Sequence, residues 1–290
     1  MTTLGPNTTP GTYEFQVQDL LHDPNSNRWT LPQIDGYINE ARKQLVMDTG
    51  CLRTLQPSYI TQGVEQYTFG QVTGASIIAG GSGYSGPSVV FSGGGGSGAA
   101  ATLTQSGGAV NTISFSNYGA GYTSAPAAAV SDTGGGINAS IQAGILSAYT
   151  FDVLSINLIW GTERYTLRWL PWRAFSPWYR PYTAQSYQRQ PVCWSEYADN
   201  TIFIGPTPDQ TYAVEFDTVI LPTPFVTGDT TTQDAIAAKS QDPIKFYAAY
   251  LAKKNAQNYG EAEQHLQDYT RRMKEVVGAY TGRLPDVYGP

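Results

Sequence analysis

A stretch of 79 residues, Gly70–Ala148, carries a single charged side chain, Asp132, together with 19 of the chain's 31 glycines. The other 211 residues carry 39 charges, so two kinds of polypeptide are joined in one chain. A segment so poor in charge and so rich in glycine is either a flexible linker or a β structure with many tight turns. The composition changes abruptly at both of its ends, which predicts an insertion.

The segment repeats internally. The motif Gly81-Ser82-Gly83-Tyr84 returns 38 residues later as Gly119-Ala120-Gly121-Tyr122, and a glycine run follows each copy. Short alternating apolar stretches lie between the motifs, which favours β structure over a linker. We therefore expect residues 70–148 to form an inserted all-β repeat domain. The spacing Gly81-x-Gly83-x-x-Gly86 also matches the dinucleotide fingerprint, but strand-like residues follow it where that site needs a helix.

The flanks of the insertion, Tyr67–Phe69 and Tyr149–Phe151, are near-copies of each other. Joined together they give one continuous strand pattern. The insertion therefore interrupts either a strand or a tight loop between strands, because inserted domains are tolerated where the two ends lie close together.

Outside the insertion, helices are followed by strands and then by helices, which predicts an α+β fold. Thr30 and Gln33 form a capping box, and Asp242-Pro243 opens a later helix. The expected elements are a helical bundle, made of two N-terminal helices and a C-terminal helical hairpin, and an antiparallel β domain. The predicted helices span residues 13–22, 30–49, 243–259 and 261–278, the sheet spans residues 58–69 and 149–226, and an arm spans residues 279–290.

Composition narrows the function. The formal net charge is −6, whereas proteins that bind nucleic acid mainly through phosphates are basic. Two Cys and two His without a metal-ligand spacing predict no metal site, and we find no motif for a catalytic site or a cofactor. The N-terminus lacks the features of a signal peptide, and no apolar run is long enough for a membrane span.

One segment, residues 160–190, combines a local charge of +4 with many aromatic side chains. Arginine interleaved with aromatic residues is typical of protein interfaces and also of single-strand nucleic-acid sites, while some of these rings can simply form the core of the sheet. The acidic chain favours a subunit or partner interface. Its candidate residues are Arg164, Arg168, Trp169, Trp172, Arg173, Trp178 and Arg180.

The residues outside the insertion resemble the head-to-tail adaptor (connector) proteins of tailed bacteriophages. The resemblance lies in Arg28-Trp29-Thr30 with Ile34–Ala41, in Gln190–Trp194 with Ile202–Pro208, and in the terminal helical hairpin. It covers residues 1–69 and 149–290, which would form the adaptor core. The insertion is similar to the Gly-x-Gly-Tyr repeats of phage tail and fibre proteins.

The resemblance implies a structural, non-enzymatic virion protein at the head–tail junction, made in the host cytoplasm. Its implied partners are the portal protein, the tail nozzle, a tail fibre and further copies of itself in a ring of twelve. Double-stranded DNA would pass through the ring without specific binding. The arm would bind the portal through Leu284, Val287 and Tyr288.

Two other functions stay open on the sequence alone. The first is a receptor- or glycan-binding tail component, with exposed tyrosines of the repeat stacking on sugars. The second is an enzyme such as a cell-wall hydrolase, for which the sequence offers no constellation of residues.

Overall fold

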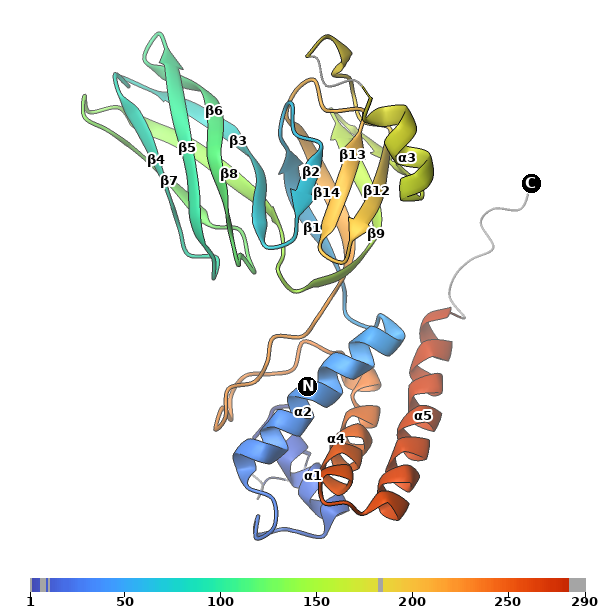
Figure 1. The fold of residues 1–290 in the computed structure, drawn as a ribbon. Helices are drawn as coiled ribbons and strands as arrows, with labels where there is room; N and C mark the ends of the chain where they lie inside the picture. The colour runs from blue at the N-terminus through green and yellow to red at the C-terminus, as the bar shows by residue number, and fades with distance from the viewer. Residues whose placement is uncertain (1, 6–8, 10, 182–184, 282–290) are drawn as a thin grey trace. The chain divides into compact units, whose positions relative to one another are not determined.

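A computed structural model describes residues 2–5, 9, 11–181 and 185–281, with side chains described as far as Val277. The chain divides into two compact units, one formed by Met1–Arg53 with Val219–Pro290 and the other by Thr54–Thr218. Helices dominate the described part of the first unit, and strands dominate the second (Figure 1). The α+β class expected from the sequence is confirmed.

The described part of the first unit contains four α-helices, of which α4 packs against each of the others. They are α1 (Tyr13–Leu21), α2 (Leu31–Thr49), α4 (Asp242–Asn255) and α5 (Tyr259–Thr281). The start of α2 is as expected, because the Thr30 N–H donates to the Gln33 side chain at 3.0 Å. Gly50, at φ 61°, ends the helix in the left-handed conformation that glycine adopts freely.

The boundaries of the C-terminal helices differ from expectation. Gly260 was expected to end one helix, but it lies inside α5, and the link between α4 and α5 is residues 256–258. Gln257 makes the turn at φ 58°. The predicted arm also begins later, because residues 279–281 continue α5. A glycine near a helix start costs only about 1 kcal/mol, so packing against α4 overrides it.

A long connection joins the strand β14 (Tyr212–Ile220) to α4. The sheet was expected to reach residue 226, but β14 ends at Ile220. Residues 221–237, which we call the strap, lie along α2 instead. The Asn39 side chain donates to the Phe225 carbonyl at 3.0 Å and accepts from the Phe225 N–H at 2.8 Å. The Asn39 amide thus makes the two backbone hydrogen bonds that a neighbouring strand would otherwise make.

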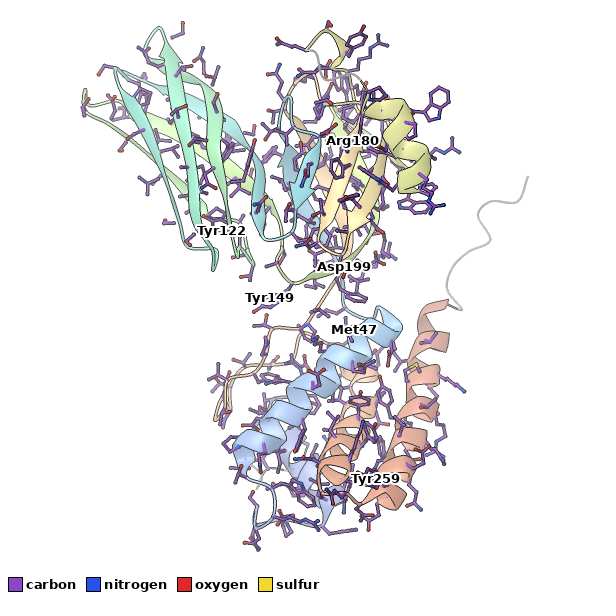
Figure 2. All side chains as sticks on the ribbon, in the orientation of Figure 1. Met47, Tyr122, Tyr149, Arg180, Asp199 and Tyr259 are labelled. Atoms are coloured by element: carbon purple, nitrogen blue, oxygen red, sulfur yellow. The ribbon has the colours of Figure 1, made fainter. Side chains whose placement is uncertain are left out.

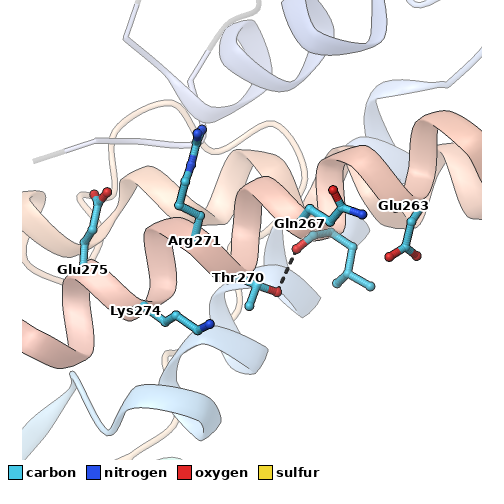
Figure 3. Close-up of a pocket in the computed structure, with 7 residues that line it drawn as sticks. Glu263, Gln267, Thr270, Arg271, Lys274 and Glu275 are labelled. Atoms are coloured by element: carbon cyan, nitrogen blue, oxygen red, sulfur yellow. Dashed lines mark hydrogen bonds between the residues drawn. The ribbon is translucent and has the colours of Figure 1, made fainter.

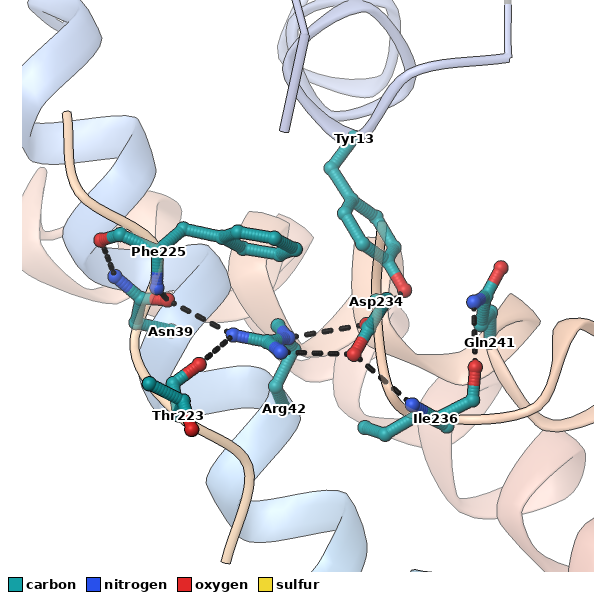
Figure 4. Close-up of polar contacts among 8 residues, drawn as sticks. All are labelled: Tyr13, Asn39, Arg42, Thr223, Phe225, Asp234, Ile236 and Gln241. Carbon is teal, nitrogen blue, oxygen red and sulfur yellow. Dashed lines mark hydrogen bonds and ion pairs between the residues drawn. The ribbon is translucent and has the colours of Figure 1, made fainter. Parts of the chain in front are cut away.

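A buried ion pair fixes the strap (Figure 4). Arg42 donates to both carboxylate oxygens of Asp234, from Nε at 3.0 Å and from Nη2 at 2.8 Å, and both side chains are at most 2 % exposed. The Tyr13 hydroxyl donates to the same carboxylate at 2.7 Å. Arg42 also donates to the Thr223 carbonyl at 2.9 Å. One carboxylate thus joins α1, α2 and the strap.

The second unit contains two four-stranded sheets around a shared core. Their orders are β1-β14-β9-β10 and β11-β12-β13-β2. The strands are β1 (Arg53–Ile60), β2 (Gln66–Thr68), β9 (Thr150–Trp160), β10 (Glu163–Thr166), β11 (Arg168–Trp169), β12 (Cys193–Ala198) and β13 (Thr201–Gly205). Ile156, Phe216, Trp194 and Ile204 come from both sheets and are buried in one cluster. The pairs β9–β10, β12–β13 and β13–β2 are antiparallel, and β11 and β12 are parallel.

Two expectations about this region are wrong. Residues 172–179, expected in the sheet, form the helix α3 (Trp172–Tyr179), because their apolar side chains recur at helical spacing. The continuous strand across the insertion is also wrong, because β2 and β9 belong to different sheets. The insertion therefore lies in the connection between strands, which was the other alternative.

The insertion is a folded sheet and not a linker. Its six strands follow the order β3-β8-β7-β4-β5-β6. They are β3 (Gln71–Ser82), β4 (Pro87–Ser92), β5 (Ser97–Ser106), β6 (Ala109–Ala120), β7 (Ala127–Asp132) and β8 (Ile137–Leu146). The first copy of the repeat is β3–β5 and the second is β6–β8, and β6 begins and ends 38 residues after β3. The strand order is symmetric, because replacing each strand by its equivalent in the other copy gives the same order read backwards. We call residues 71–146 the module.

The repeated tyrosines lock the two copies of the module together. Tyr84 of the first copy packs on Gly136 of the second, where a Cβ would lie 2.5 Å from its ring. Tyr122 of the second copy packs on Gly96 of the first, where a Cβ would lie 2.6 Å from its ring. Both tyrosines are at most 4 % exposed. Each motif therefore needs a glycine from the other copy.

The only charge in the module, Asp132, organises a turn. Its carboxylate accepts backbone N–H groups from Gly86 at 2.6 Å, from Gly134 and Gly136 at 3.0 Å each, and from Ser85. These bonds lower its pKa despite an opposing desolvation contribution. At the corresponding place in the other copy, the Gly94 carbonyl accepts the Thr123 N–H at 2.8 Å.

Replacing Arg42 by Met should destabilise the helical unit by about 3–5 kcal/mol, because it leaves the Asp234 carboxylate buried without its cation. Amide hydrogen exchange of α2 under native conditions measures this free energy. The matched control is Arg271→Met, whose ion pair is exposed and should contribute under about 1 kcal/mol. A loss for Arg42→Met no larger than that of the control would contradict the role of the pair.

Asp132→Ala should lower the thermal midpoint of the module at pH 7, because it removes the acceptor of several backbone N–H groups. Since folding lowers the pKa of this carboxyl, its contribution is present above the ordinary value of 3.8 and is lost as the pH falls below it. The difference between wild type and variant should therefore shrink at pH 3. Ser92→Ala, at the end of β4, is the control, and it should leave the thermal midpoint unchanged at both pH 7 and pH 3.

Candidate functional site

The helix α3 is fixed to the outer face of the second sheet by one side only. Phe175 is fully buried, and Trp172 and Tyr179 pack beside it against β13. A Cβ at Gly205 would lie 2.8 Å from the Phe175 ring, so this glycine lets the helix approach the strand. The spacing of these three rings predicts such a helix, and it is the signal that the sheet assignment overlooked.

Arg180, just after α3, fastens the helix to the sheet (Figure 2). Its Nε donates to Glu65 at 3.0 Å, and its guanidinium lies 4.7 Å from the Phe203 ring and 5.3 Å from the Trp172 ring. Because the Arg180 side chain is 38 % exposed, the pair contributes only about 1 kcal/mol. Trp172 and Arg180 therefore help to hold α3 on the sheet, and their place in an interface stays a prediction.

The other candidate residues point to solvent. Trp178 is 78 % exposed and Trp169 is 53 % exposed, while Arg168 and Arg173 are also exposed. Neither of these arginines forms an ion pair with any residue that the structure describes. Arg164 forms a long ion pair with Glu215, at 3.5 Å, and 65 % of the Arg164 side chain is exposed. Of the seven interface candidates, Trp172 and Arg180 thus hold α3 on the sheet, and the other five are exposed to solvent.

A shallow groove lies beside this surface. It has a volume of about 420 Å³ and is lined by Trp160, Tyr165 and residues 190–192, among others. The Trp160 ring lies 5.4 Å from that of Tyr212, so the groove has an aromatic wall. Its lining holds no ionised side chain that could perform chemistry. The groove therefore offers an aromatic contact surface.

The thiol nearest to this surface is not a nucleophile. Cys193 is buried and donates to the Gly205 carbonyl at 3.3 Å. Burial raises its pKa to about 11, so the thiolate is scarce at neutral pH. Among the described residues, no three His, Cys, Asp or Glu side chains lie close enough together to hold a metal ion.

The histidines lie in the helical unit. His22 takes the left-handed conformation at the end of α1, with φ 55°, and His265 lies on α5. Burial and the nearby Lys253 lower the pKa of His265, so it is mainly neutral at pH 7. Lys253 itself pairs with Glu261 at 2.6 Å. These contacts belong to the packing of α4 against α5.

The outer face of α5 is mostly polar (Figure 3). Glu263, Gln267, Arg271 and Lys274 line a hollow there, but all of its described lining comes from this one helix. A single helix face cannot enclose a ligand, so we treat it as open surface. The predicted portal-binding residues Leu284, Val287 and Tyr288 lie outside the described residues.

Sequence reasoning missed the polar interior of the helical unit. Arg42 and Asp234 are 192 positions apart, and no local pattern links them. Asp35 is buried beside the Glu14 carboxyl and the Thr227 hydroxyl, and burial raises its pKa. A polar residue on the apolar stripe of an amphipathic helix was the available signal.

Comparison with known families agrees with the resemblance seen in the sequence. Residues 13–287 match the model of one family, described as SU10 adaptor protein. The match extends from α1 through the module to the C-terminal segment. No curated protein matches the chain. No helix of the described residues is long and apolar enough to cross a membrane. The chain belongs to the SU10 adaptor protein family.

Proposed function

We propose that this phage structural protein forms a ring, of twelve copies by family resemblance, between the portal and the tail nozzle. The observation that carries the proposal is the family match over residues 13–287. The division into a helical unit and a strand-rich unit agrees with a protein that presents different surfaces to two neighbours. No catalytic role is needed for this function.

The charge of the chain suits a conduit. With a net charge of −6, the protein repels phosphate more than it attracts it, so double-stranded DNA can pass without being held. The exposed residues Trp169, Trp178 and Arg173 are of the types that dominate protein interfaces. They would contact a neighbouring subunit or the nozzle, at the head–tail junction of the virion.

The module would face away from the channel and contact a fibre or a neighbouring tail protein. Glycan binding by its repeated tyrosines is disfavoured, because Tyr84 and Tyr122 are 4 % and 1 % exposed and cannot stack on a sugar. Its exposed face carries instead small hydroxyl side chains paired across strands, such as Ser88 with Ser131 at 2.8 Å.

Removing residues 282–290 should abolish binding to the portal protein and leave the thermal midpoint unchanged. The cut follows Thr281, the last residue of α5, so the helix is preserved. The arm is too short to have a core of its own, and its apolar residues Leu284, Val287 and Tyr288 would be buried on the portal. Electron microscopy of portal mixed with wild-type or shortened protein shows whether a ring forms below the portal.

A full-length variant with those three residues changed to Ser should lose binding in the same way, and Arg283→Ser is its control. Wild-type protein that forms no ring on the portal would contradict the proposed function. A shortened protein that still binds normally would contradict only the role of the arm.

Replacing residues 72–145 by Asn-Gly should give a folded protein that still binds the portal but no longer attaches a fibre. Gln71 and Leu146 are paired across an antiparallel ladder, so a two-residue turn can join them. Leu146 is kept because it is fully buried in the core of the two sheets. The thermal midpoint should fall by a few degrees, because the bonds from Ser58 and Thr61 to Thr73 are lost. Aggregation of this variant would mean that the module is an inseparable part of the fold.

A further inference from the structure

Charge is segregated within the strand-rich unit. Residues 54–218 contain nine acidic residues and five basic ones, and all five basic residues are arginines between Arg164 and Arg189. The rest of this unit, outside residues 160–190, carries eight acidic side chains and no basic one. Such a separation leaves complementary surfaces on one molecule.

Two arginines mark one end of the second sheet. The Arg168 N–H donates to the Val192 carbonyl at 2.9 Å, directly before β12 begins. The Arg189 N–H donates to the Thr207 carbonyl at 3.0 Å, just after β13 ends. Both residues are exposed, and neither forms an ion pair with a described residue. Trp169 lies beside Arg168 and is 53 % exposed. We call Arg168, Trp169 and Arg189 the basic end.

Acidic residues mark the opposite end of the same strands. Asp199 lies in the turn between β12 and β13, and Glu196 lies near the end of β12. Asp152, near the start of β9 in the other four-stranded sheet, lies close enough to act on Glu196. Burial and the Asp152 carboxylate raise the pKa of Glu196. None of the three forms an ion pair with a described residue, Arg173 of α3 included. Tyr197 beside them is 60 % exposed. We call Asp152, Glu196, Tyr197 and Asp199 the acidic end.

The two ends cannot neutralise each other within one molecule. The strand β12 runs from Cys193 to Ala198, and a strand of that length spans about 17 Å. The screening length at physiological salt is about 8 Å, so the attraction across the strand is largely lost. Figure 2 labels Asp199, which lies in the turn at the acidic end.

We infer that the basic end of one copy docks on the acidic end of a second copy. Each end offers one exposed aromatic ring beside charges that have no ion-pair partner among the described residues, so contact would bury apolar area and pair the charges together. The contact joins two different surfaces, and such head-to-tail contacts repeat until they close a ring or continue as a filament. That the contacts close into a ring is an inference that rests on the proposed function. The contact between two copies is inferred from the basic and acidic ends alone.

Nucleic acid fits these observations less well. Phosphates would bind the basic end alone and would leave the acidic end unexplained. The acids would also repel a strand that ran along β12. A second copy accounts for both ends at once.

Sedimentation velocity of the free protein tests the contact without the portal. At 50 mM salt, self-association should rise with protein concentration, and at 500 mM salt it should weaken at least tenfold. R168E/R189E and D152K/D199K should each abolish self-association. An equimolar mixture of the two variants should restore it, and so should the variant that carries all four changes, because each then pairs opposite charges again.

R271E/K274E is the matched control, since it makes the same change of net charge on exposed residues of α5. It should associate like the wild type. Equal loss in this control, or failure of the mixture to associate, would overturn the proposal. It would also be overturned if R168E/R189E kept self-association and lost only the binding of a single-stranded oligonucleotide. Because the portal is absent, these outcomes are independent of whether the protein forms an adaptor ring on it.

Discussion

The helical unit depends on a single buried carboxylate. Asp234 holds the guanidinium of Arg42 and the hydroxyl of Tyr13, and these three groups come from the strap, α2 and α1. Burying an ion pair is costly, so it stabilises only where further hydrogen bonds satisfy the remaining donors. Here Nη1 of Arg42 donates to Asn39 and to the Thr223 carbonyl, so four of its five N–H groups have a partner. The position of the strap, and with it the path from the strands to α4, follows from these bonds.

The strand-rich unit is built on a different principle, because its module contains almost no charge to direct it. Specificity there comes from shape: a ring of one copy fills the space left by the missing side chain of a glycine in the other. Asp132 supplies the one electrostatic contact, and it acts on backbone N–H groups rather than on another charge. Thus a buried hydrogen-bond network defines the structure of the helical unit, and steric complementarity defines that of the module.

The sequence predicts those features that are encoded locally. The cap of α2 at Thr30, its end at Gly50 and the repeat in the module all follow from neighbouring residues. Features that depend on distant partners were missed or misassigned, including the strap along α2 and the helix α3 on the second sheet. The candidate interface shows the same limit. Composition identified its residues, but only the packing separates Trp172 and Arg180, which hold α3, from Trp178, which faces solvent.

The interlocked glycines and tyrosines of the module have a consequence for how such a protein evolves. A change at Gly96 harms the site of Tyr122, and a change at Gly136 harms that of Tyr84, so neither copy can drift alone. Recombination that replaced one copy would separate each ring from its matching glycine. The two ends of the module, in contrast, are neighbours at Gln71 and Leu146. We therefore expect residues 71–146 to be gained or lost between phage lineages as one complete unit.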